Sequence, residues 1–88
     1  MNLTPRGKQV YDTIEPFLRQ GAALDLLVQQ VTWLKAMGCT QQETYDALVK
    51  LRQRQESPER EDRLLELMDV VAGWCPRADF IWPDVLKT

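Results

Sequence analysis

Cysteines and carboxylates are the side chains of this sequence that could do chemistry, and each lacks the partner it would need. Cys39 and Cys75 follow glycine-ended segments, in MGCT and GWCP, where a thiol beside a helix N-terminus can become nucleophilic. Histidine, the commonest general base and metal ligand, is absent. The cysteines also lack the close pairing of a zinc site. We therefore interpret both as small free thiols and predict no catalytic residue, no cofactor and no metal.

Carboxylates are numerous, but nearly all fall on the polar sides of the predicted helices, where solvated surface is their usual role. The glycines are isolated, so the sequence contains no phosphate-binding loop. Residue types alone do not exclude an acid–base pair of carboxylates. The sequence favours a protein that is not an enzyme.

The elements that must position these side chains are helical. Turn residues separate four segments with the apolar spacing of a helix, and short alternating stretches typical of strands are missing. The 88 residues, 44% hydrophobic and 27% charged, include no linker long enough to separate two domains. We predict one all-α domain over residues 1–88, a compact four-helix bundle with an irregular aromatic C-terminal tail packed on it.

The sequence indicates where the first helix begins and which faces of the second helix are apolar. Thr4 and Pro5 predict the start of the first, and Pro16 inside it predicts a kink or a split. The second, from about Ala22 to Met37, carries one apolar stripe and a second, flanking one, and this width predicts contact on two sides. The first stripe contains Leu24, Leu27, Val28, Val31 and Leu34, and the flanking stripe contains Leu26, Trp33 and Met37.

Capping signals mark the third and fourth helices. Thr40 and Glu43 form a Thr-x-x-Glu capping box ahead of the third helix. Ser57 is expected to cap the fourth helix, which should begin at Pro58 and end at Gly73. Acidic residues in its first turn favour the positive end of the helix dipole.

Residues 27–54 resemble a helix-turn-helix unit, because a helix, a short turn containing Gly38 and a polar helix follow one another. The resemblance implies a nucleic-acid-binding regulator with Lys50, Arg52 and Arg54 as its basic stripe. These residues lie beyond the part of the helix that would meet base edges, and the net charge of −2 disfavours nucleic acid. This function is therefore the alternative interpretation.

The stretch LKAMGCTQQETYDAL is also similar to the Met-Gly-aromatic loop of ubiquitin-associated domains, which are small three-helix binders of ubiquitin. The matching residues are Met37 and Gly38, with Ala47 and Leu48 downstream. Cys39 stands where those domains usually carry an aromatic residue. The resemblance implies ubiquitin binding as a further alternative.

The charge of the chain is unevenly distributed. Residues 1–55 carry 7 basic and 5 acidic groups, whereas residues 56–88 carry 4 basic and 8 acidic groups. An acidic half attracts a basic partner. In size, charge and lack of catalytic residues the chain is similar to the small acidic helical proteins that neutralise bacterial nuclease toxins, so we predict an inhibitor or immunity-type protein. The predicted partner-binding residues are Glu59, Glu61, Asp62, Glu66, Asp69 and Trp82.

The tryptophans of the C-terminal tail differ in their predicted roles. Trp74 directly follows Gly73, so it should fold back on the fourth helix and be mostly buried. Trp82 lies between Pro76 and Pro83 and should be partly exposed, where it could anchor a partner. Docking of the tail on a second copy, giving a homo-oligomer, is an alternative.

The chain shows no sign of a membrane or secretory segment. No run approaches the roughly 18 apolar residues of a membrane span, and MNLTPRGKQV lacks the apolar core of a signal peptide. We expect a bacterial protein of the cytoplasm.

Overall fold

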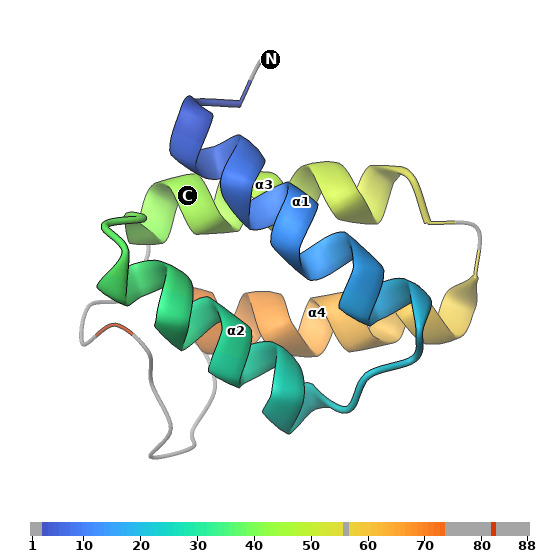
Figure 1. Cartoon of the computed structure of the whole chain (residues 1–88). Coiled ribbons are helices and arrows are strands. Elements are labelled where there is room, and N and C mark those ends of the chain that lie inside the picture. The colour runs from blue at the N-terminus through green and yellow to red at the C-terminus, as the bar shows by residue number, and fades with distance from the viewer. Residues whose placement is uncertain (1–2, 56, 74–81, 83–88) are drawn as a thin grey trace.

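The computed structural model describes residues 3–55, 57–73 and 82, and this part of the chain contains four helices and no strand (Figure 1). The helices are α1 (Pro5–Arg19), α2 (Leu24–Ala36), α3 (Gln41–Gln53) and α4 (Pro58–Ala72). The predicted all-α, four-helix architecture is therefore confirmed. None of the described helices combines the length and the apolar character that a membrane crossing requires.

Each helix packs mainly against two others, so the four helices form a ring around the core. Both α1 and α4 pack against α2 and α3, whereas α2 and α3 scarcely touch each other. Thr4 at the start of α1 contacts Glu43 near the start of α3, and Tyr11 contacts Arg54 just beyond the end of α3. These contacts show that α1 and α3 run in the same direction, and Figure 1 shows α2 and α4 running in the opposite sense.

The hydrophobic core lies between the helices and takes side chains from all four. The apolar spacing of each helix places these residues on one face, as the sequence predicts. Close packing of a few large aliphatic side chains supplies most of the stability of so small a domain. The side chains that are fully buried include Val10, Ile14, Leu27, Val31, Leu34, Leu48, Leu51, Leu64, Leu67 and Val71.

The helix starts of α1 and α3 share one hydrogen-bond network. Thr4 Oγ1 accepts from the Gly7 N–H at 3.0 Å and donates to Glu43 Oε2 at 2.6 Å. Thr40 Oγ1 accepts from the Glu43 N–H, and Glu43 Oε1 accepts from the Thr40 N–H, both at 3.1 Å. The capping box is therefore confirmed, and it is linked to the N-cap of the neighbouring helix.

Two side chains tie the start of one helix to the end of another. Arg60 Nη2, in the first turn of α4, donates to the carbonyl of Arg19 at the end of α1 at 3.0 Å. Gln41 Nε2, at the start of α3, donates to the carbonyl of Val71 at the end of α4 at 2.8 Å. Both bonds satisfy carbonyls that a helix end leaves without an intrahelical partner.

The structure refines two local predictions. Of the kink or split predicted at Pro16, the split does not occur, and α1 continues to Arg19 as one helix. Pro16 lies in the last turn and is exposed, so its missing N–H removes only one helical bond. That bond would have gone to the carbonyl of Asp12, which is itself an exposed residue. Ser57 occupies the N-cap position of α4, but its side chain makes no capping hydrogen bond, and Pro58 follows at the first helical position.

Candidate protein-binding surfaces

Four of the five carboxylates predicted to bind a partner lie on one face of α4. Glu59, Asp62, Glu66 and Asp69 are all exposed, and they are separated by three, four and three positions. Because a helix returns to the same side every three or four residues, they span only about 80° of its circumference. We refer to these four residues as the α4 acidic stripe.

Glu61, the fifth predicted carboxylate, does not belong to this stripe. It lies two positions from Glu59, which places it about 200° away around the helix. Its Oε1 is 3.5 Å from Arg52 Nη2 of α3. The structure therefore assigns Glu61 to a contact between two helices of the bundle and separates it from the other four carboxylates.

The basic residues of α4 leave the acidic stripe negatively charged. Arg60 is directed toward α1, where it donates to the Arg19 carbonyl. Arg63 Nη1 lies 3.6 Å from Glu66 Oε2, and both side chains are about half exposed, so this pair contributes little. Within residues 3–55, 57–73 and 82 the stripe makes no other ion pair. With five acidic and two basic residues, α4 carries a net charge of −3.

Trp82 is half-buried, and it packs against the core, which confirms its predicted partial exposure. Lys35 Nζ of α2 lies 5.6 Å from the centre of the Trp82 ring, within the range of a cation–π contact. The contact defined for Trp82 is thus with α2 rather than with a carboxylate of α4. The predictions for Trp74 and Cys75 fall outside the described residues.

The flanking apolar stripe of α2 is exposed, contrary to the prediction from its sequence. Leu26, Trp33 and Met37 keep 37%, 51% and 54% of their surface exposed. The expectation that both stripes of α2 make contacts within the protein is therefore wrong. The reason is the ring arrangement, in which α1 and α4 cover only the side of α2 that faces the core. We refer to these three residues as the α2 apolar stripe.

Cys39 is a buried free thiol, as predicted. Its Sγ lies 3.8 Å from the Arg6 carbonyl oxygen. Burial raises the pKa of the Cys39 thiol, and the nearby carboxylate of Glu43 raises it further, so the reactive thiolate is disfavoured. Cys39 also stands at the aromatic position of the Met-Gly-aromatic loop, and there it faces the interior rather than a partner.

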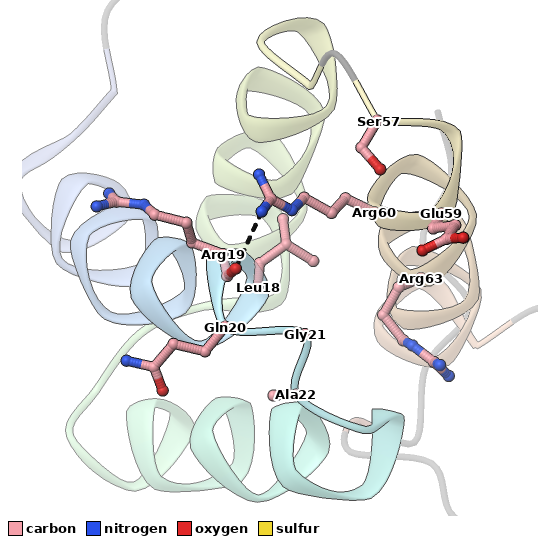
Figure 2. A pocket seen from close by; sticks show the side chains of 9 residues that line it. All are labelled: Leu18, Arg19, Gln20, Gly21, Ala22, Ser57, Glu59, Arg60 and Arg63. Atoms are coloured by element: carbon pink, nitrogen blue, oxygen red, sulfur yellow. Dashed lines mark hydrogen bonds between the residues drawn. The ribbon is translucent and has the colours of Figure 1, made fainter.

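A cleft with a volume of about 560 Å³ lies between the end of α1 and the start of α4 (Figure 2). Arg19, Arg60 and Arg63 line it, which suggests an anion site. Figure 2 shows Arg60 extending toward α1, with the side chains of Arg19 and Arg63 extending away from it. The Arg19 guanidinium pairs with Glu15 on α1. The cationic groups therefore do not converge on one point, as bidentate anion recognition requires.

The segment that resembles a helix-turn-helix unit lacks its geometry. In that motif the two helices pack against each other, but α2 and α3 scarcely touch here. Its basic residues are divided between two sides of α3, because Lys50 and Arg54 line the same cleft beside α1 whereas Arg52 lies beside α4. Arg54 Nη1 donates to Tyr11 Oη of α1 at 3.3 Å, and Lys50 lines a cleft with Tyr11, whereas Arg52 pairs with Glu61 of α4. Lys50, Arg52 and Arg54 do not form one basic stripe.

No known protein family matches this chain, and neither does any curated protein or solved structure. Among the described residues, no three cysteine or carboxylate side chains gather as metal ligands. The surfaces described above are therefore the basis for inferring function.

Proposed function

We propose that the chain is a non-enzymatic protein-binding module that neutralises a basic partner through the α4 acidic stripe. It would act in the bacterial cytoplasm as an inhibitor or immunity-type protein, with a toxin as its partner. The observation that carries this proposal is the row of four exposed carboxylates, Glu59, Asp62, Glu66 and Asp69, on a single face of α4.

The row has the length and polarity that suit a basic patch on another protein. From Glu59 to Asp69 the helix rises about 15 Å, a distance over which several lysine or arginine side chains can be matched. Charges of one sign on one face accelerate encounter with an oppositely charged surface and reject partners of like charge. Because the carboxylates remain hydrated before binding, their main contribution is to association rate and specificity.

The helix that carries the acidic stripe is held firmly. Its opposite side contributes Leu64, Leu67 and Val71 to the core, and all three are fully buried. Gly73 ends the helix in a left-handed conformation with φ of 79°, and Gln41 of α3 bonds the Val71 carbonyl. A surface on a rigid helix loses little conformational freedom when a partner binds.

Trp82 supports the proposal as an apolar anchor. A half-buried indole keeps part of its ring available, and tryptophan is enriched among the residues that dominate binding energy. The ring packs against the core, and the Lys35 ammonium lies over it. In the proposed complex the acidic stripe selects the partner by charge, and Trp82 adds buried apolar area.

The proposal is tested by a variant that neutralises only the acidic stripe. This variant combines Glu59→Gln, Asp62→Asn, Glu66→Gln and Asp69→Asn. The matched control combines Asp12→Asn, Glu15→Gln, Asp25→Asn and Asp46→Asn, which changes the net charge equally but on other helices. Each protein is immobilised and exposed to an extract of the source cells, and bound proteins are identified by mass spectrometry.

The expected result is a protein with a basic surface that binds the natural chain and the control but not the stripe variant. Direct titration of the purified partner should then show that the stripe variant binds at least about tenfold more weakly, since several charge pairs are lost. Equal binding by the stripe variant and the control would show that the location of the carboxylates is irrelevant and would refute the proposal.

A further inference from the structure

The exposed large hydrophobic residues in the described part of the chain all belong to the α2 apolar stripe. Each side chain of Leu26, Trp33 and Met37 keeps more than a third of its surface exposed, although the core itself is fully closed. On the core-facing side of α2, Leu24, Leu27, Val31 and Leu34 are already at most 9% exposed. The three exposed residues therefore add nothing to the core, and a row of large apolar groups on a small soluble protein marks an interaction site.

We propose that two copies of this chain associate through their α2 apolar stripes, with the two α2 helices packed antiparallel. The inference is independent of the proposed function, because it concerns a different surface. Trp33 and Lys35 lie two positions apart, hence about 200° apart around α2. Trp82, which contacts Lys35, is therefore on the other side of the helix from Trp33.

The lack of charged residues on α2 itself beside the stripe favours a second copy as the occupant. A surface that meets its own copy brings identical residues together, so charges within it would repel each other. The residues that border the stripe on α2 are Gln29, Gln30 and Ala36, all uncharged. Asp25 and Lys35, the charged residues of α2, lie more than a quarter turn away from the centre of the stripe. A basic partner of the kind that suits α4 would find no carboxylate in the α2 stripe.

The spacing of the stripe is close to symmetric, as an antiparallel pair requires. A two-fold axis midway between Leu26 and Met37 places Leu26 of each copy opposite Met37 of the other copy. Trp33 lies only about 2 Å along the helix from that axis, so the two indoles meet near the centre of the interface. Tryptophan and methionine are both enriched in protein interfaces. The two Asp25 side chains fall at opposite ends of such a pair.

The size of the stripe predicts a weak dimer. The helix has 13 residues and is about 20 Å long, and it lies on an outer edge of the bundle in Figure 1. One helix face covers less than the area of about 800 Å² per partner that stable complexes bury. Association should therefore require micromolar or higher protein concentrations.

Sedimentation analysis tests the proposal with the full chain alone. The mass should rise from the monomer value of 10.2 kDa toward twice that value as the concentration increases from about 10 μM to about 1 mM. Trp33→Glu should raise the dissociation constant by more than about tenfold, because it introduces a charge at the centre of the interface. Thr32→Glu, which places the same charge on an exposed position of α2 outside the stripe, is the matched control and should dimerise as the natural chain does.

The antiparallel arrangement is tested by a pair of charge changes. Leu26→Glu and Met37→Lys should each weaken the dimer, and the chain with both changes should dimerise more strongly than either single variant, because each introduced glutamate faces an introduced lysine. Circular dichroism checks that all variants fold. A natural chain that stays monomeric throughout, a Trp33→Glu variant that dimerises normally, or no recovery in the double variant would overturn the proposal.

Discussion

Thr4 at the start of α1 and Glu43 in the first turn of α3 are joined by a hydrogen bond of 2.6 Å from Thr4 Oγ1 to Glu43 Oε2. Glu43 also accepts from the backbone N–H of Thr40, so one carboxylate connects the N-caps of two helices. The bond from Thr4, followed by the bond from Thr40, lowers the pKa of Glu43 from its ordinary value of 4.5. The connection fixes how α1 and α3 lie side by side.

The lowered pKa of Glu43 predicts a dependence of stability on pH. Because the pKa is lower in the folded than in the unfolded state, the carboxylate stabilises the fold above pH 4.5, and this contribution is lost as pH falls through the lower, folded-state pKa. Glu43→Gln should lower the melting temperature at about pH 7 and have a smaller effect at about pH 3. Thermal melts across this range measure the difference between the two proteins.

The matched control for Glu43 is Asp12→Asn, which removes an exposed carboxylate of α1. Its effect on the melting temperature should be small at every pH. A difference between Glu43→Gln and the natural chain that stayed constant with pH would contradict the role given to the Glu43 carboxylate.

Gly7 lies where the start of α1 packs closely against the start of α3. A Cβ at this position would lie 3.2 Å from Thr4 Oγ1 and 3.5 Å from the Glu43 carbonyl oxygen. Thr4 Oγ1 is held by two hydrogen bonds and cannot move without losing the cap. Gly7→Ala should therefore lower the unfolding free energy by about 1 to 2 kcal/mol, the cost of a lost N-cap, although alanine normally stabilises a helix relative to glycine.

Urea denaturation measures the effect of Gly7→Ala. The control is Gln9→Ala, an exposed position two residues further along α1, which should change stability by less than about 0.5 kcal/mol. If Gly7→Ala proved as stable as the natural chain or more stable, the contact between the two helix starts would be less tight than the structure shows.

The sequence predicts the helices well because their signals are local. Thr4, the Thr40–Glu43 box and Gly73 act through backbone groups a few residues away, so spacing alone identifies them. Ser57 shows the limit of such signals, because it occupies the predicted position without making the bond. The link from Thr4 to Glu43 and the crowding at Gly7 join residues far apart in the sequence, and no local pattern contains them.

The candidate surfaces were predictable in part for the same reason. Four carboxylates share a face of α4 because of their spacing, and spacing also separates Glu61 from them. The exposure of Trp33 was not predictable, since an apolar stripe looks the same whether a neighbouring helix or solvent covers it. Only the ring arrangement, in which α2 and α3 scarcely touch, shows that this side of α2 has no neighbour among the described helices.

The two tryptophans of the tail are predicted to differ in their contribution to stability. Trp74→Ala should strongly lower the melting temperature, since truncating a well-packed indole costs about 3 to 5 kcal/mol. Trp82→Ala should cost less than half as much, because Trp82 is only half-buried. Thermal melts of both variants compare them. Equal large losses would make Trp82 a structural residue, and a negligible loss at Trp74 would contradict its predicted burial.

Cys39 is predicted to react only when the protein unfolds. In a Cys75→Ser background, the thiol should react with a disulfide reagent such as DTNB far more slowly in buffer than in denaturant, because Cys39 is 3% exposed and burial raises its pKa. The reaction is followed by absorbance. Equally fast labelling under both conditions would show an accessible thiolate and would reopen a chemical role for Cys39.

The most direct test of the central claim is the salt dependence of binding to the purified partner. Titrations at low and at physiological ionic strength should show that affinity for the natural chain falls steeply with salt, because exposed charges are screened. The same dependence should appear in the control variant with altered carboxylates on other helices, and should largely disappear in the variant that neutralises Glu59, Asp62, Glu66 and Asp69. An affinity that is independent of salt, or equally dependent in both variants, would contradict the claim that the α4 acidic stripe binds a basic partner.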